Sequence, residues 1–300
     1  KKLMNLKNKI ELWQLKQRQG QPLEVKERLT ENRIRAWYEQ NDGEVYVSFS
    51  GGKDSTVLLH LVRKFYPDVS AVFVDTGLEY PEVKRFVRAV ENVTWLRPKI
   101  PFYEVIKKYG YPVISKEVSQ QIYEFRTAKS EKTKRTRWYG ANNKYKSGKI
   151  PEKWKPLTIS NLFKIGAQCC DVMKKRPIKK YEKETDLHSF IGVMAKDSAL
   201  RKQSCLRHGC NMENGKASRP MMFWTDADVW GYIKKYNLKY SKIYDMGVLN
   251  TGCMFCMFGV HLEKGKNRFQ RMKTTHPNQY NFCINTLGCG KVLDAIGVSY

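Results

Sequence analysis

Six residues in the first fifth of the chain have the types and spacing of an anion-binding turn. Residues 50–55 read Ser-Gly-Gly-Lys-Asp-Ser, after the apolar run 45–47 and before an apolar helical pattern that begins at Thr56. Free N–H groups at a helix N-terminus, beside glycines that let an oxyanion approach the backbone, favour phosphate. Lys53 adds a cation and Asp54 can hold a metal bound to phosphate, so both are catalytic candidates. The predicted phosphate-binding residues are Ser50, Gly51, Gly52, Lys53, Asp54 and Ser55; the alternative is an ordinary glycine-rich turn.

The cysteines form a second centre of possible chemistry. The chain has eight, and without a secretory signal they favour metal or redox chemistry over structural disulfides. Cys253 and Cys256 have Cys-x-x-Cys spacing, which lets two thiolates reach one metal from a tight turn. The tandem Cys169 and Cys170 could bring two further ligands from a distant element. An iron–sulfur cluster, zinc and no metal are the alternatives, although adjacent cysteines are unusual zinc ligands.

The remaining cysteines are weaker candidates. Cys205 and Cys210 bracket His208 and could be a redox or sulfur-relay pair, incidental thiols of a flexible loop, or replacements for one side of a metal site. Cys289 lies between two glycines and is a candidate catalytic thiol on a mobile segment, or simply a small residue in a turn. Cys283 has apolar neighbours and we expect it to be more buried.

The elements that position the turn read as a strand–helix–strand unit. Residues 71–74 are apolar and β-branched, so residues 45–74 predict a parallel βαβ unit. The acidic, turn-rich segment 75–82 then follows the second strand at its carboxyl end, where open α/β sheets bind ligands. We expect adenine recognition around Phe73 and Val74, and ribose or metal contacts, or no contact, from Asp75 and Glu79.

These segments resemble the phosphoadenosine phosphosulfate (PAPS) reductase family, a branch of the PP-loop ATP pyrophosphatases. The resemblance is carried by SFSGGKDSTVLLHL at 48–61 and VFVDTGLEYPE at 72–82, and it continues at 192–201, 220–230 and in Tyr244-Asp245-Met246-Gly247 before the Cys-x-x-Cys. The resemblance implies an α/β fold with a doubly wound, mostly parallel sheet, of the adenine nucleotide alpha-hydrolase-like type.

The same resemblance implies cofactors and their ligands. The nucleotide would be ATP, with Mg²⁺, or an adenylyl sulfate or PAPS, and Arg201 is a candidate for a distal phosphate or sulfate. The tandem pair with a distant Cys-x-x-Cys is similar to the cluster-binding pattern of the family's iron–sulfur members. By that similarity the [4Fe–4S] ligands would be Cys169, Cys170, Cys253 and Cys256.

Helical periodicity, composition shifts and the cysteines suggest three parts. Residues 1–40 read as two helices broken at 20–22, residues 41–250 as the PP-loop α/β domain, and residues 251–300 as a cysteine-rich C-terminal region. Within the second part, residues 126–165 form a basic insertion with interleaved aromatic residues. Such an insertion either contacts nucleic acid or is a solvated surface whose aromatic residues pack on the core.

The net charge of the chain indicates the class of partner that it would bind. Lys and Arg number 55 against 29 Asp and Glu, a net charge of +26, which favours a polyanion such as tRNA or DNA; solvated lysines are the alternative. No apolar run reaches membrane-spanning length and no secretory signal is recognisable. We therefore expect a cytoplasmic protein without a membrane partner.

Three functions compete. The first is ATP-dependent adenylation with sulfur transfer onto a nucleic acid, with a sulfur donor such as a cysteine desulfurase. The second is an adenylyl sulfate or PAPS reductase that produces sulfite with a thioredoxin-like reductant. The C-terminal Glu-Cys-Gly-Leu-His motif of assimilatory sulfonucleotide reductases is absent, so Cys289 would have to replace its thiol. The third is a non-catalytic subunit that binds nucleotide and nucleic acid.

Overall fold

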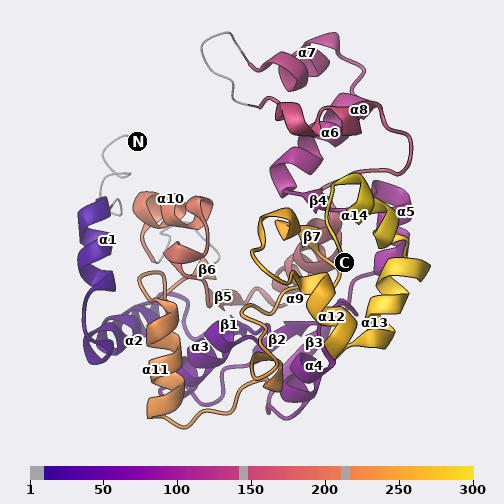
Figure 1. Ribbon diagram of the computed structural model, residues 1–300. Coiled ribbons are helices and arrows are strands. Elements are labelled where there is room, and N and C mark those ends of the chain that lie inside the picture. Colours follow the sequence, from indigo (N-terminus) through magenta and orange to yellow (C-terminus); the bar gives the residue numbers. More distant parts are fainter. Residues whose placement is uncertain (1–9, 142–147, 211–216) are drawn as a thin grey trace. The chain divides into compact units, whose positions relative to one another are not determined.

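The computed structural model describes residues 10–141, 148–210 and 217–300 (Figure 1). Contacts divide the chain into two compact units. Unit 1 comprises the described parts of Lys1–Asp75, Tyr80–Leu96 and Ile178–Thr251, and unit 2 comprises Thr76–Glu79, Arg97–Pro177 and Gly252–Tyr300. The limits 1–40, 41–250 and 251–300 stay a prediction.

A five-stranded parallel sheet organises unit 1. Its strands are β1 Val45–Ser48, β2 Ala71–Val74, β3 Val93–Leu96, β5 His188–Ile191 and β6 Ala217–Ser218. Their order is β3-β2-β1-β5-β6, and every adjoining pair is parallel. The expected α/β fold with a parallel sheet is confirmed. The direction of strand addition reverses between β1 and β5, and ligands of such sheets bind at the carboxyl ends beside that point.

Helices cover both faces of this sheet. The helices are α1 Leu12–Gln19, α2 Leu23–Gln40, α3 Lys53–Arg63, α4 Pro81–Arg88, α9 Arg176–Thr185, α10 Ala199–His208 and α11 Asp226–Lys235. Trp37 of α2 packs its ring edge-on against His188, which is in register with Val45. The next residue, Tyr46, points to the opposite face, where it contacts Tyr181 of α9. The two helices expected before residue 41 are confirmed as α1 and α2, and residues 1–9 lie outside the described part.

Unit 2 is mainly helical. It contains α5 Phe102–Tyr109, α6 Lys116–Thr127, α7 Glu131–Tyr139, α8 Pro156–Ile159, α12 Arg268–Thr275, α13 Pro277–Asn281 and α14 Cys289–Ala295. Two π-helical turns, Asp171–Lys175 and Phe282–Thr286, precede α9 and α14. No helix in the described ranges is long and apolar enough to span a membrane.

One short strand after α5 does not join the main sheet. Val113–Ile114 (β4) pairs with Met257–Phe258 (β7) in a separate two-stranded parallel sheet. Ile114 has a φ of +63°, outside the strand region of the backbone map, so regular pairing ends after two residues.

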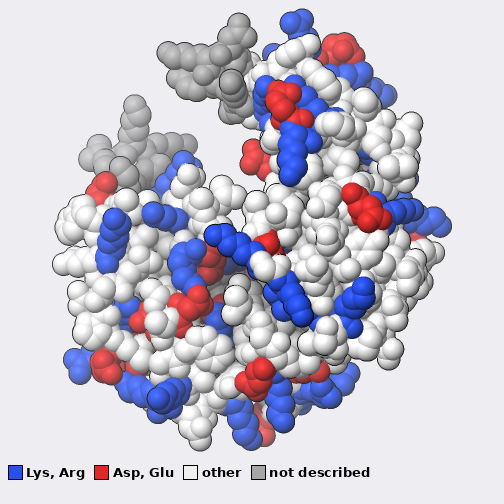
Figure 2. All heavy atoms as spheres, viewed as in Figure 1, with Lys and Arg blue, Asp and Glu red and all other residues white. Residues whose placement is uncertain are grey.

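The basic insertion is tied together by one arginine and leaves a helix exposed. Arg126 of α6 donates hydrogen bonds to the carbonyl oxygens of Leu157 and Ser160, and to that of Phe163 at 2.8 Å. Helix α7 has no buried residue, and Tyr139 at its end is 67% exposed. Figure 2 shows lysine and arginine side chains gathered over α6 and α7. This surface is exposed.

A buried ion pair joins α2 to α11 and predicts a stability effect. Lys26 is 2% exposed, and its Nζ lies 2.7 Å from Oδ2 of Asp228. Removing the lysine leaves a carboxylate partly desolvated, so we expect Lys26→Ala to lower the free energy of unfolding by about 3 kcal/mol. The control is Lys64→Ala, which removes a more exposed pair with Glu31 and should cost about 0.5 kcal/mol. Equal shifts of the denaturant midpoint in both variants would contradict this expectation.

Candidate functional site

The PP-loop is closed by its own serines. The backbone N–H of Ser50 donates to Oγ of Ser55 at 3.1 Å, and that hydroxyl donates to the carbonyl oxygen of Gly52 at 2.9 Å. Gly51 has a φ of +69°, and a Cβ there would lie 2.6 Å from Val87 of α4. The loop therefore needs glycine for its backbone conformation and for its close approach to α4.

Tyr244 occupies one of the donors that an anion would use. The backbone N–H of Lys53, at the first position of α3, donates to the hydroxyl of Tyr244 at 2.8 Å. That hydroxyl also lies 3.3 Å from Oγ1 of Thr251. Burial is the main cause that raises the pKa of Tyr244, so the group is a neutral phenol. A phosphate that takes the N–H of Lys53 must displace this phenol.

Four charged side chains meet beside the loop. The ammonium of Lys53 is almost fully buried and lies 2.9 Å from both Oδ1 of Asp54 and Oδ1 of Asp226. Lys196, which follows β5, pairs with the same Asp226. Burial first, and then the charge of Lys53, lowers the pKa of Lys196. Two cations and two anions thus lie together at the carboxyl end of the sheet.

Asp226 and Tyr244 are site residues that sequence reasoning missed. Asp226 is the first residue of α11, directly after the N-cap Thr225, and reads as an ordinary acidic residue in a first helical turn. Both lie in segments quoted for the family resemblance, which was the only available signal. Neither has a local pattern that indicates contact with Lys53.

The residues expected to recognise adenine and ribose have structural partners. Phe73 is 1% exposed and packs edge-on against Trp95, so its ring is part of the core. Val74 is half-buried at the strand end. Asp75 forms an ion pair with Lys84 at 2.9 Å. At this edge the backbone and Val74 remain for a base, while Asp75 needs to exchange Lys84 for a ligand.

Glu79 and Arg201 also have partners. The carboxylate of Glu79, in unit 2, accepts hydrogen bonds from the N–H and hydroxyl of Thr76 at 3.0 and 2.8 Å. It therefore shapes its own turn. Arg201, in unit 1, is exposed and pairs with Asp197 on the preceding turn. No described interaction joins Arg201 to residues 50–55.

Four cysteine thiols interact in unit 2. Cys169 and Cys170 precede the π-helical turn, and the N–H of Cys256 donates to the carbonyl of Cys253 at 3.1 Å, which closes a tight turn. Burial, and then the other three thiols, raises the pKa of Cys169. Burial also raises the pKa of Cys253, to about 11, with Cys170 and Cys256 contributing. The structure thus brings together the four predicted metal ligands.

Donors and cations surround these thiols. Lys174 donates a hydrogen bond to Cys253, and the backbone N–H of Phe258 donates to the sulfur of Cys256. Arg268, whose charge favours the Cys256 thiolate, donates to the carbonyl of Cys256 at 3.0 Å. Such donors stabilise metal-bound thiolates and suit a soft metal or an iron–sulfur cluster. Within the described ranges, however, no three His, Cys, Asp or Glu side chains converge closely enough for a single metal ion.

Cys289, a candidate mobile thiol because of its flanking glycines, is buried in the structure. It is the first residue of α14, has no exposed surface, and shares a hydrogen bond with the equally buried Cys283. That bond, followed by burial, raises the pKa of Cys283. A Cβ at Gly290 would lie 3.0 Å from Ile284, so this glycine allows close packing.

Cys205 and Cys210 form another buried pair, in unit 1. They are 1% and 4% exposed and interact with each other, and burial raises the pKa of Cys205 to about 11. The arginines Arg18 and Arg219 oppose that shift. Thiols of this kind are protonated and shielded near neutral pH.

Comparison with known proteins identifies the family. The profile of the phosphoadenosine phosphosulfate reductase domain matches residues 44–136 and 102–258, which together exceed half of the chain. The chain belongs to this family. An adenosine 5′-phosphosulfate reductase of Lysinibacillus sphaericus is 24% identical over 224 residues, which are 74% of this chain and 77% of that enzyme.

Other family relatives are longer than this chain. An uncharacterized protein of Methanocaldococcus jannaschii is 27% identical over 264 residues, which cover 85% of this chain and 51% of that protein. A second from the same organism is 27% identical over 233 residues, covering 74% of this chain and 38% of that protein. The chain therefore spans about half or less of the length of these relatives.

Two solved structures show limited similarity. The PAPS reductase of Candida auris has a TM-score of 0.43 and 17% identity, covering 75% of this chain and 87% of that one. The U34-tRNA thiolase of Methanococcus maripaludis, solved with its [4Fe-4S] cluster, has a TM-score of 0.38 and 14% identity, covering 92% and 82%. Both TM-scores lie below 0.5.

The packing of Gly51 predicts how the PP-loop responds to a methyl group. We expect Gly51→Ala to lower the thermal midpoint clearly more than Gly247→Ala does. Both positions have positive φ, +69° and +82°, but only at Gly51 does a Cβ meet other atoms, whereas nothing lies within 4 Å at Gly247. Calorimetry of both variants measures the difference. Equal thermal midpoints in the two variants would mean that α4 accommodates the added methyl group without loss of stability, and that the close approach of Gly51 to α4 is unimportant.

Proposed function

We propose that this PP-loop protein of the PAPS reductase family binds ATP and uses it to adenylate a nucleic acid, onto which sulfur is then transferred. The charged group of Lys53, Asp54, Lys196 and Asp226 carries this proposal. Two ammonium groups suit a polyphosphate, and two carboxylates suit its metal ion. The named curated relatives of the family are reductases of adenosine 5′-phosphosulfate, so an adenine nucleotide is the natural ligand.

The chain's own residues would prepare ATP for attack. The phosphates take the N–H groups at the start of α3, with Lys53 and Lys196 compensating the charge that develops on departing pyrophosphate. Tyr244 releases the N–H of Lys53 as the phosphates arrive. Mg²⁺ held by Asp54 and Asp226 would neutralise and orient the phosphates. The products would be an adenylated substrate and pyrophosphate.

A [4Fe–4S] cluster would be held by Cys169, Cys170, Cys253 and Cys256. Four interacting thiols match the four cysteine ligands of such a cluster, and adjacent cysteines are unusual ligands of zinc. The cluster would supply a site at which sulfur is bound or electrons are exchanged. Lys174 and the N–H of Phe258 would orient the ligands. A cysteine desulfurase is the proposed class of sulfur donor.

Charge and the insertion support a nucleic-acid substrate. The net charge of +26 favours a polyanion, and α7 carries exposed cations with the unburied Tyr139 at its end. Lys155 lies 4.5 Å from the centre of the Trp138 ring, so cations and aromatic rings are interleaved there. Trp154, in contrast, is buried, so only part of the insertion can offer rings to bases.

The cluster proposal predicts metal content. Protein purified without oxygen should contain about four irons and four sulfides per chain by definition of the cluster. Cys253→Ser and Cys169→Ser should lose most of the iron, because each removes one thiolate ligand. Cys205→Ser is the matched control, since it removes a buried thiol of the other unit and should retain iron. One zinc per chain, or iron loss in the control alone, would contradict the ligand assignment.

The ATP proposal predicts pyrophosphate release. Wild-type protein given ATP, tRNA or DNA and a sulfur donor should release pyrophosphate, and Lys53→Ala should reduce the rate at least about a hundredfold, because a phosphate-compensating cation is lost. Lys202→Ala, which changes an exposed lysine on α10, should leave the rate within about twofold. Absence of pyrophosphate from wild type with every nucleic acid supplied would contradict the proposal.

A sulfonucleotide reductase is the second candidate, favoured by the reductases among the relatives. It would use a cysteine thiolate and a thioredoxin-like reductant and would release sulfite without ATP. The complete burial of Cys289 speaks against that residue as the nucleophile. Sulfite production that persists in Cys289→Ser would exclude Cys289 as the nucleophile. Nucleic-acid binding without turnover of any nucleotide would instead indicate the third candidate, a non-catalytic subunit.

A further inference from the structure

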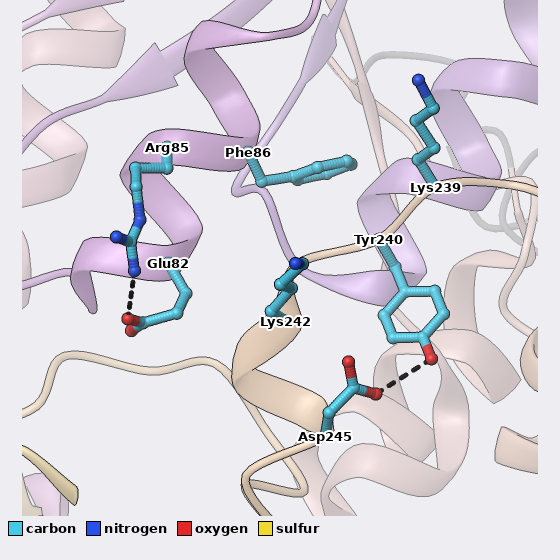
Figure 3. Close-up of a pocket in the computed structure, with 7 residues that line it drawn as sticks. All are labelled: Glu82, Arg85, Phe86, Lys239, Tyr240, Lys242 and Asp245. Carbon is cyan, nitrogen blue, oxygen red and sulfur yellow. Dashed lines mark hydrogen bonds and ion pairs between the residues drawn. The ribbon is translucent and has the colours of Figure 1, made fainter.

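Unit 1 has a pocket that the proposed chemistry does not use. Its cavity volume is about 710 Å³, within the range of small-molecule sites. One wall is α4, which contributes Phe86, and the other is the segment after α11, which contributes Tyr240 (Figure 3). All of the lining residues belong to unit 1.

The aromatic walls of the pocket are held in place from behind. The Tyr240 ring packs edge-on against Trp230, with ring centres 5.3 Å apart, and its hydroxyl donates to Asp245 at 3.0 Å. The ring of the half-buried Phe86 packs against that of Phe49, next to the PP-loop, with ring centres 6.2 Å apart. In Figure 3 the Phe86 ring projects from α4 toward Tyr240 and Lys239. Rings fixed in this way can stack on a flat ligand with little loss of conformational entropy.

The charges of the pocket favour an anion beside the rings. Arg85 is paired with Glu82, whereas Lys239 and Lys242 are exposed and have no carboxylate partner in the described residues. Two unpaired ammonium groups beside aromatic rings are complementary to a planar base with an attached phosphate. The carboxylate of Asp245 can accept a hydrogen bond from an amino group of the base.

We propose that this pocket binds one unpaired nucleotide, with the base against Phe86 and Tyr240 and the phosphate on Lys239 and Lys242. The inference deepens the proposed function, because the nucleotide would belong to the nucleic acid that is modified; a free nucleotide offers the same chemistry. Tyr240 lies four residues from Tyr244, which contacts Lys53 in the PP-loop. The ring centres of Tyr240 and Tyr244 are 6.3 Å apart, so the bound nucleotide would lie beside the proposed ATP site in the same unit.

Binding of fluorescent single-stranded 8-mers of DNA and of RNA to the full chain tests the stacking part. Tyr240→Ala should raise Kd about fivefold or more, because base–aromatic stacking is lost, whereas Tyr240→Phe keeps the ring and should change Kd less than about twofold. A duplex of the same sequence should compete poorly, because its bases are paired. Unchanged affinity in a Tyr240→Ala protein that retains the wild-type thermal midpoint would overturn the proposal.

Salt dependence tests the phosphate part. The double variant Lys239→Ala/Lys242→Ala should reduce the slope of log K against log salt by about 1.4, which is about 0.7 for each of two phosphates. The control Lys179→Ala/Lys183→Ala removes two exposed lysines of α9 and should leave the slope unchanged. Equal slope changes in the two double variants would overturn the proposal, because the lysines would then act only through net charge.

Three further results distinguish a free nucleotide from one in a strand, and failure of the pocket inference from failure of the proposed function. If cytidine or adenosine 5′-monophosphate, but no strand, loses affinity in Tyr240→Ala, the pocket serves a free nucleotide and the proposed pocket chemistry stands. If strands bind and stimulate pyrophosphate release equally in wild type and both pocket variants, only the pocket inference fails. If wild type binds neither strand nor nucleotide, the pocket inference and the nucleic-acid part of the proposed function fail together.

Discussion

A buried ammonium group must be paired with carboxylates, and Lys53 imposes this constraint on the PP-loop of unit 1. Burying a lysine without a partner would cost several kcal/mol, so Asp54 and Asp226 must both lie within reach of its Nζ. Asp226 begins α11 and also pairs with Lys196 after β5. The carboxyl end of β1, the start of α3 and the start of α11 are therefore fixed relative to one another by one side chain. Replacing carboxylates by phosphate oxygens keeps the charges balanced when a nucleotide binds.

The cysteines illustrate how the environment divides one residue type into different chemical roles. The thiols of Cys169, Cys170, Cys253 and Cys256 interact with one another, and burial raises the pKa of Cys169, Cys253 and Cys256, whereas the charge of Lys174 opposes that shift. The pair Cys283 and Cys289 is enclosed by apolar packing and bonded within itself. Sequence spacing alone could not separate these cases, because flanking glycines at Cys289 indicate flexibility as readily as they indicate tight helix packing.

The sequence predicts those features of the fold that depend on residues close to one another in the chain. The βαβ unit over 45–74, its phosphate-binding turn and the two N-terminal helices follow from apolar periodicity and glycine placement. Contacts between distant segments are different: the pairing of β4 with β7, the carboxylate of Asp226 on Lys53 and the phenol of Tyr244 depend on how the chain returns to the sheet. Phe73 and Asp75 lie near the carboxyl edge of the sheet, as the sequence predicts. The sequence did not reveal that Trp95 packs against Phe73 or that Lys84 forms an ion pair with Asp75.

The hydrogen bond from Lys53 to Tyr244 makes the PP-loop and the segment that follows α11 thermodynamically linked. A phosphate that takes this N–H must free Tyr244, which ends a short 3₁₀ turn and whose ring packs against that of Tyr240. Coupling between two binding equilibria is reciprocal. If release of Tyr244 changes the affinity of the pocket at Tyr240 for its ligand by some factor, that ligand must change the affinity of the PP-loop for phosphate by the same factor. One phenol hydroxyl therefore connects the backbone of the PP-loop to the segment that follows α11.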